Sequence, residues 1–205
     1  MKLIVITAPD FLSEEAEVLT QLLDAGADRL HLRKPGCAEE QLESLIRRLP
    51  KEYYSRISLH DHFPLQARYG LGGVHLNGRN PHVPQGFEGL VSRSCHSLEE
   101  VDRYGLQTDY HFLSPIFDSI SKQGYRSGFG TEQLRKAANE GILTRKTIAL
   151  GGVTADKFGL LHDIGFGGAA LLGSIWQGYR SADDLSAVLA RFEELVEACR
   201  KAGKD

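Results

Sequence analysis

The sequence predicts one α/β domain over residues 1–205, a (β/α)8 or TIM barrel. Short apolar and β-branched runs alternate with amphipathic helical segments, which is typical of parallel strands covered by helices. Eight such runs occur, the number that closes a barrel. The alternative, an open doubly wound sheet, is disfavoured because no Gly-x-Gly-x-x-Gly motif follows the first run.

The predicted strands are near-continuous apolar runs, as expected for parallel strands with both faces covered. They span residues 3–7, 28–32, 56–60, 72–75, 90–94, 109–113, 146–150 and 168–171. Helical periodicity is found in residues 13–25, 38–49, 97–104, 131–139, 154–163 and 183–201, and the last helix extends to about residue 203. Residues 77–89 contain Pro81 and Pro84, so a loop is expected there in place of a helix.

The composition excludes several classes of protein. Apolar residues make up 41 % and charged residues 25 % of the chain, an ordinary globular balance. The net charge of −3 gives no basic excess, so no nucleic-acid partner is expected. Three widely spaced cysteines without a Cys-x-x-Cys pair suggest a reducing, cytoplasmic setting. Neither a signal peptide nor an apolar run long enough for a membrane span is predicted.

Polar groups follow nearly every predicted strand, and in such barrels the carboxyl ends of the strands form the active site. These strand ends are His31-Leu32-Arg33-Lys34, His60-Asp61-His62, His75-Leu76-Asn77, the segment 92–96, the segment 114–117, Gly151-Gly152 and Gly173-Ser174. The two glycine-containing turns follow strands 7 and 8, where barrels commonly bind phosphate. The alternative is that these residues are simple turn glycines.

Strand 2 ends in two cations that could grip phosphate or pyrophosphate, Arg33 and Lys34. Strand alternation places His31 and Arg33 on one face and Lys34 on the other. A solvated basic pair is the alternative.

The end of strand 3 carries a candidate ligand for Mg²⁺, Asp61, which could instead cap a helix. The flanking His60 and His62 have the spacing of two transition-metal ligands, but a third ligand is not evident. Hydrogen-bonding roles are the alternative for both.

Strand 5 ends in Ser94 and His96, which are expected to face the ligand, whereas Ser97 and Glu100 form a capping box. No acidic partner has the spacing of a hydrolytic triad. Lys122 lies in a loop after strand 6 that is long enough to close over a ligand, with a solvated lysine as the alternative.

In order, these motifs resemble the thiamine phosphate synthase and thiazole tautomerase family over about residues 2–180. The matching segments are His31-Leu32-Arg33, His60-Asp61-His62 followed by Gly73-Val74-His75-Leu76, Ser94-Cys95-His96-Ser97, Ser114-Pro115-Ile116-Phe117 with Lys122, and Leu150-Gly151-Gly152-Val153. The resemblance implies that hydroxymethylpyrimidine diphosphate loses pyrophosphate and is captured by the nitrogen of a thiazole phosphate. The implied roles are pyrophosphate contacts from Arg33, Ser94 and Lys122, Mg²⁺ binding by Asp61, and thiazole phosphate binding by Gly151-Gly152 and Gly173-Ser174.

Three positions differ from the synthase pattern: Pro35 replaces a lysine, His60 an asparagine, and Asn80 the second Mg²⁺ aspartate. His31 and the segment 94–100 are closer to the tautomerase, whose base after strand 6 falls here on Pro115. In that case His31, His60 or His96 would have to serve as the base.

Three functions therefore stay open: synthase first, then tautomerase, then a non-catalytic binding or regulatory protein of the thiamine pathway. In each case the expected partners are small phosphorylated molecules, hydroxymethylpyrimidine diphosphate and thiazole phosphate. The last helix could cap the barrel or pack against a second copy in a homodimer.

Overall fold

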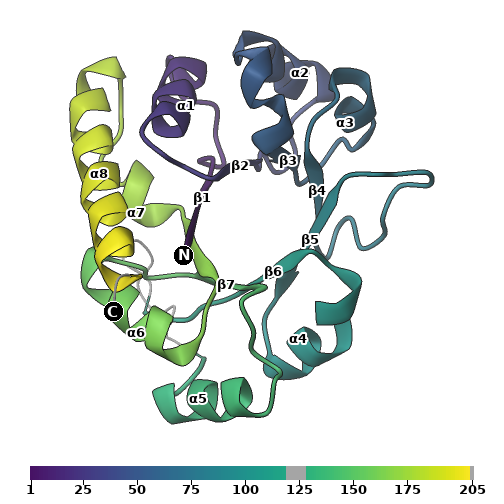
Figure 1. Cartoon of the computed structure of the whole chain (residues 1–205). Coiled ribbons are helices and arrows are strands. Elements are labelled where there is room, and N and C mark those ends of the chain that lie inside the picture. The colour runs from purple at the N-terminus through teal and green to yellow at the C-terminus, as the bar shows by residue number, and fades with distance from the viewer. Residues whose placement is uncertain (119–127, 204–205) are drawn as a thin grey trace.

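The computed structural model describes residues 1–118 and 128–203, in which eight parallel strands close into a barrel in chain order (Figure 1). The strands are β1 (Lys2–Ile6), β2 (Arg29–Leu32), β3 (Ile57–Leu59), β4 (Gly73–Leu76), β5 (Leu90–Cys95), β6 (Tyr110–Leu113), β7 (Thr147–Leu150) and β8 (Gly168–Leu171). The β1–β8 pairing that closes the barrel places Leu3 opposite Ala169. The predicted barrel is confirmed, and every predicted strand overlaps an observed one.

Helices form a ring outside the strands (Figure 1). They are α1 (Glu15–Asp24), α2 (Glu39–Arg48), α3 (Pro64–Tyr69), α4 (Leu98–Tyr104), α5 (Thr131–Asn139), α6 (Phe158–Ile164), α7 (Gly173–Trp176) and α8 (Leu185–Ala202). Short 3-10 turns cover Lys51–Arg56, Gly105–Gln107, Ala155–Lys157 and Ala182–Asp184. None of the helices in the described ranges is long and apolar enough to cross a membrane.

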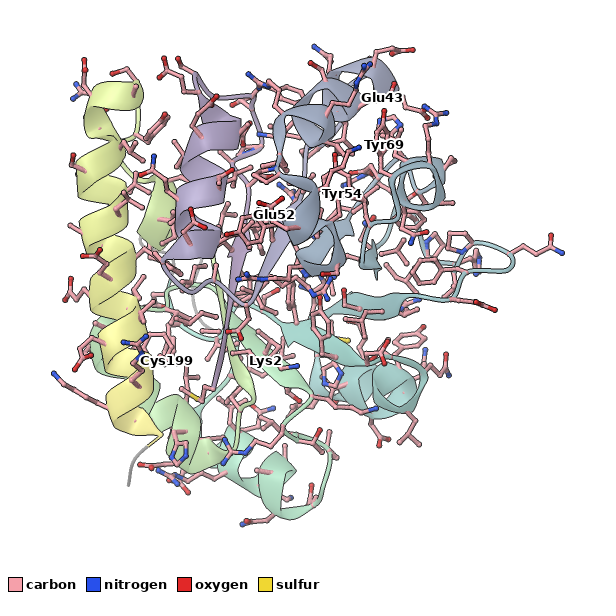
Figure 2. The ribbon with its side chains drawn as sticks, turned by 45° about the horizontal axis from the view of Figure 1, so that its top comes forward. Lys2, Glu43, Glu52, Tyr54, Tyr69 and Cys199 are labelled. Carbon is pink, nitrogen blue, oxygen red and sulfur yellow. The ribbon has the colours of Figure 1, made fainter. Side chains whose placement is uncertain are left out.

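The predicted helices are confirmed with two differences. Residues 154–163 divide into a 3-10 turn followed by α6. The sequence analysis missed α3, because six residues with Leu65 as the one buried side chain give no helical period. Its start was marked by Pro64 in the first turn. Figure 2 shows Tyr69 of this helix beside Glu43 of α2, to which its hydroxyl donates a hydrogen bond of 2.5 Å.

No helix separates β4 from β5, as predicted, and this loop projects from the barrel (Figure 1). The predicted cap of α4 is also present, since Ser97 Oγ accepts a hydrogen bond from the Glu100 amide. The long C-terminal helix α8 runs along the outside of the barrel and buries Val188, Phe192 and Leu195 against it. Local signals of strand, turn and cap therefore agree with the fold.

Lys34 occupies a different environment from the one expected. Its side chain is buried and its Nζ lies 2.6 Å from Glu15 Oε1 in a fully covered ion pair. The same ammonium donates to the carbonyls of Ala8 and Asp10, which fastens the β1–α1 loop. Burial lowers the pKa of Lys34 and raises that of Glu15, and the ion pair opposes both shifts. Both readings of Lys34, phosphate ligand and solvated cation, were wrong, although its placement on the face opposite His31 was right.

The barrel interior divides into two parts. An apolar half is formed by Ile4 and Ile6 of β1, Phe112 of β6, Ile148 of β7 and Ala170 of β8. A polar half is formed by His31, Ser58, His60, His75 and Ser92, which come from β2 to β5 and the residue after β3. All ten side chains are buried, so the interior is filled on both sides.

Candidate functional site

A hydrogen-bonded series of side chains leads through the polar half toward the mouth of the barrel. The hydroxyl of Tyr110 lies 2.6 Å from His31 Nε2, and His31 Nδ1 lies 2.9 Å from His60 Nε2. Burial lowers the pKa of His31 and of His60 well below the ordinary value, so both rings are neutral at physiological pH. His31 is fully buried below the mouth, and it can therefore act on a ligand there only through His60.

The sequence analysis placed His75 at the end of a predicted strand but gave it no role in the site. Its Nδ1 lies 2.9 Å from Ser92 Oγ and its Nε2 lies 2.8 Å from Ser94 Oγ, so the ring fixes the hydroxyl of a predicted ligand-binding residue. The sequence held a signal for this role, because the alternation of side chains along β4 points His75 into the barrel. Burial lowers the pKa of His75 to about 3, which keeps the ring neutral.

His60 and His62, whose spacing would suit two metal ligands, are separated in the structure and take the alternative, hydrogen-bonding roles. His62 has a φ of 52° and its Nε2 lies 2.8 Å from the carbonyl oxygen of Cys37, outside the barrel interior. His60 instead clusters with His31 and His75, whose ring nitrogens lie within 4.8 Å of one another. The His60 and His75 rings are stacked, with centroids 4.1 Å apart and planes 24° apart. In-plane lone pairs of nearly parallel rings cannot meet at one ion, so this cluster is a hydrogen-bonded stack.

Asp61 is an acidic group at the mouth with several hydrogen-bonding partners. Its two carboxylate oxygens accept hydrogen bonds from Arg79 at 3.2 and 3.0 Å, and Oδ1 also accepts one of 2.8 Å from Asn80 Nδ2. Burial lowers the pKa of Arg33, and its charged neighbours act in opposite directions, since Arg79 lowers this pKa further and Asp61 raises it. Sequence analysis placed Arg33, Asp61 and Asn80 here but missed Arg79.

This donor set suits a hard cation that arrives with a diphosphate. Mg²⁺ is commonly held by one or two carboxylates together with substrate phosphate oxygens and water. Asp61 supplies one carboxylate, and its side chain is 16 % exposed at the mouth. Asn80 adds an amide in contact with it. The residues present therefore fit Mg²⁺, provided that Arg79 moves to the phosphate.

The end of β5 presents its two polar residues differently. Ser94 is partly buried against His75, whereas His96 is exposed. Nδ1 of His96 lies 3.2 Å from both the carbonyl oxygen and the hydroxyl of Ser114, and its backbone amide donates to Glu100. His96 is therefore the exposed histidine of this rim, held by the end of β6.

The glycines after β7 are required by packing. Gly151 and Gly152 have φ values of 99° and 64°. A Cβ on Gly152 would lie 2.3 Å from the Asp118 carbonyl oxygen, and one on Gly151 would lie 3.1 Å from Pro115. The interpretation of Gly151 and Gly152 as turn glycines therefore explains why glycine is needed at both positions. It is compatible with a phosphate group bound to their backbone amides. Thr154, which precedes the 3-10 turn Ala155–Lys157, makes no capping bond with its side chain.

The end of β8 has the predicted form. Gly173 and Ser174 open the short helix α7, where the Ile175 and Trp176 amides donate to the Leu172 carbonyl. The first amides of a helix have no partner within the helix, so they are available to an anion. Lys122, the predicted loop ligand, lies outside the described residues.

Fold and site define a (β/α)8 barrel with cationic, acidic and hydroxyl groups gathered at the carboxyl ends of its strands. Comparison with known proteins narrows this class: the family described as thiamine monophosphate synthase matches residues 3–175. The chain belongs to that family.

Individual relatives agree. The thiamine-phosphate synthase of Serratia proteamaculans is 28 % identical over 193 residues, covering 90 % of this chain and 89 % of the relative. The crystal structure of thiamine phosphate pyrophosphorylase from Bacteroides thetaiotaomicron is 40 % identical with a TM-score of 0.89 and covers 98 % of both chains. A second thiamine phosphate pyrophosphorylase, from Pyrococcus furiosus, is 22 % identical with a TM-score of 0.76 over 98 % of this chain and 96 % of its own, which supports the fold.

Proposed function

We propose that this protein is a thiamine phosphate synthase, which joins hydroxymethylpyrimidine diphosphate to thiazole phosphate and releases pyrophosphate. The observation that carries the proposal is the cluster of Asp61, Arg79 and Asn80 at the mouth, beside Arg33. A carboxylate for a cation and guanidinium groups for phosphate are what a departing diphosphate requires. Family membership gives this cluster its most direct explanation.

In the reaction, the bond between the pyrimidine methylene carbon and the diphosphate oxygen breaks, and the oxygen keeps the electron pair. The thiazole nitrogen then forms a bond to that carbon. Arg33 and Lys122 stabilise the charge that collects on pyrophosphate, and the Ser94 hydroxyl, oriented by His75, contacts the same group. Mg²⁺, held by Asp61 with Asn80 adjacent, supplies further charge neutralisation when it is bound.

The remaining rim groups bind the second substrate. The amides of Gly151, Gly152, Gly173 and Ser174 receive the phosphate of the thiazole. His60 lies at the bottom of the site. Its hydrogen bond with His31 sets the orientation of the His60 ring. A cytoplasmic location and assembly into a homodimer stay predictions from the sequence.

A second candidate is tautomerase chemistry on a thiazole phosphate, favoured by the exposed ring of His96. This ring is held by Ser114 at the mouth, next to Pro115, which stands where the tautomerase has its base. A neutral histidine there could take a proton from a bound carbon acid. A binding or regulatory role remains the third alternative.

The deciding experiment measures pyrophosphate release from hydroxymethylpyrimidine diphosphate and thiazole phosphate, with and without Mg²⁺. The wild type should require Mg²⁺, and Asp61→Asn and Lys122→Ala should each lower kcat/KM by about 10²-fold or more. Asp163→Asn, an exposed carboxylate at the carboxyl end of α6, on the side of the barrel where the strands begin, is the matched control and should keep full activity.

Two other outcomes would redirect the assignment. Deuterium exchange into thiazole phosphate without pyrophosphate release, abolished in His96→Gln, would replace the synthase with the tautomerase. Thiazole phosphate binding with neither reaction would leave the binding role.

A further inference from the structure

A cavity lies at the end of the barrel opposite the mouth. Its volume is about 630 Å³, and it opens among the amino-terminal ends of β1, β6 and β7 and the turns before them. Figure 2 labels Lys2, the lining residue at the start of β1. Small-molecule sites have volumes of about 300–1,000 Å³. The cavity therefore has the size of a ligand site but stands apart from the proposed active site.

The wall of the cavity holds a buried polar atom without a partner. His111 is 1 % exposed, and its Nδ1 makes no hydrogen bond to any other described residue. Burying a polar atom without a partner is unfavourable, so a ligand that pairs with this atom gains stability from the contact. Burial also lowers the pKa of His111 to about 4, so a proton on both nitrogens does not explain the arrangement.

The surrounding hydrogen bonds decide which tautomer His111 adopts. Its Nε2 lies 2.9 Å from Thr147 Oγ1, and that hydroxyl already accepts from the Thr144 amide. The Thr147 hydroxyl is buried, so its proton needs an acceptor inside the protein. Among the hydrogen bonds of the described residues, His111 Nε2 is the one acceptor that this proton can reach. Thr147 therefore donates to Nε2, and the proton of the neutral ring sits on Nδ1. The orphaned group is an N–H donor, which calls for an acceptor.

The other lining residues indicate what kind of ligand would supply this acceptor. Apolar walls come from Val101, Leu106, Ile142 and Ile148. Leu106 is 94 % exposed at the rim, although it is a large apolar side chain. Three cations, Lys2, Arg145 and Lys146, outnumber two acids, Asp102 and Asp109. The lining is complementary to a small apolar body with a negatively charged acceptor.

We infer that this cavity is a second ligand site, which takes a small apolar carboxylate; its oxygen accepts the Nδ1–H of His111 once the wall at Gly105 opens, because that nitrogen is covered by the surrounding residues. The site is independent of the proposed reaction, since none of the residues assigned to catalysis or phosphate binding lines it.

One lining residue also connects this cavity to the mouth. Tyr110 lies on the cavity wall, and its hydroxyl makes the 2.6 Å contact with His31 Nε2. His31 in turn contacts His60, the residue before Asp61. A ligand that shifts Tyr110 will thus change the ring signals of His31, which gives a second readout.

The test uses benzoate as the probe, followed by ¹H–¹⁵N spectra of the untagged protein. Without a probe, long-range spectra of the His111 ring should identify the Nδ1–H tautomer. Benzoate should shift the amide signals of Gly105, Leu106 and Ile142 and the His111 ring with one saturable curve, half-complete on the order of 1 mM. Benzamide should bind several-fold more weakly, and benzylamine, which has no acceptor, should not bind.

Variants make the test specific. A Cβ added to Gly105 would lie 3.4 Å from His111 Cε1 and 3.8 Å from Nδ1, so Gly105→Ala covers the donor without displacing the backbone. Binding should weaken at least tenfold in Gly105→Ala. Gly159→Ala is the matched control, since its added Cβ meets nothing within 4 Å.

Three results would overturn the inference: the Nε2–H tautomer, no saturable shift up to 20-fold the expected half-saturation, or equal benzoate affinity in Gly105→Ala and Gly159→Ala. A crystal soaked in benzoate that shows only water on Nδ1 would do the same. None of these readouts involves pyrophosphate release, so failure here leaves the proposed synthase activity untouched.

Discussion

The polar half and the apolar half of the barrel interior face each other across the same bore, yet their side chains are held in place differently. In the polar half, each histidine is fixed by directional bonds, as His75 is between Ser92 and Ser94. In the apolar half, Ile4, Ile148 and Ala170 are held by shape and burial alone. Phe112 lies at the boundary, with its ring centroid 4.8 Å from that of His31 and 4.7 Å from that of His75.

The difference explains why the proposed site lies where it does. Directional bonds fix the orientation of a group that must meet a ligand, and they continue outward to Ser94 and His60 at the mouth. Packing tolerates changes of shape, and it supplies stability without chemistry. The comparison predicts that substitutions in the apolar half affect stability, whereas those in the polar half affect both stability and activity.

The largest effect is expected from Phe112→Ala. Removing a fully buried ring should lower the free energy of unfolding by about 3–5 kcal/mol, measured by urea denaturation. Leu106→Ala, at an exposed position, is the control and should change it by less than about 0.5 kcal/mol. If Phe112→Ala lowered the free energy of unfolding by less than about 1 kcal/mol, the packing of the two halves would not depend on this ring.

Ser92→Ala tests the bonds of the polar half. It leaves His75 Nδ1 buried without a partner, so we expect a loss of about 1–3 kcal/mol in unfolding free energy. Because His75 also orients Ser94, kcat should fall more than KM rises. Ser55→Ala, an exposed serine, is the control. An unchanged kcat in a destabilised Ser92→Ala would limit His75 to a structural role.

The pH dependence of stability should come from the polar half. Its histidines have folded pKa values below the unfolded value of about 6.5, so the unfolded chain binds more protons in acid. The stabilisation is complete above pH 6.5 and is lost as the pH falls toward the folded pKa, about 3 for His75. Each such histidine should lower the unfolding free energy by about 1.4 kcal/mol between pH 7.5 and 5.5.

Urea denaturation of His75→Gln at the two pH values isolates one contribution. This variant should lose about 1.4 kcal/mol less than the wild type on acidification, whereas the exposed His82→Gln should behave like the wild type. Identical acid losses in all three proteins would show that His75 makes no contribution to the pH dependence of stability.

The smallest effect belongs to the apolar half. Ile148→Val removes one methylene from a buried side chain and should cost about 0.5–1.5 kcal/mol. Steady-state kinetics should be indistinguishable from the wild type, since Ile148 is remote from the mouth. A kcat lowered more than about threefold would contradict the division between the two halves.

Local patterns were enough to predict the barrel, and they placed Arg33, Asp61, Ser94 and His96 at its mouth, whereas Asn80 came from the family resemblance. They failed where the partner lies far along the chain. Lys34 resembled a solvated lysine because Glu15 is 19 positions away, and only the pairing of β1 with β2 brings the two together. The importance of His75 depended on two serines of the next strand. Helix α3 was too short for a period to appear.

The loop that replaces a helix between β4 and β5 has an anchored part and a free part. Asn77, Arg79 and Asn80 bind one another and Asp61, and the Pro81 carbonyl accepts from Arg93. Residues 82, 83, 85 and 86 are exposed. An epitope or fluorescent peptide inserted after Gln85 should therefore be accepted without loss of folding. The barrel thus provides a natural attachment point for immobilising or imaging the protein, a few residues from its mouth.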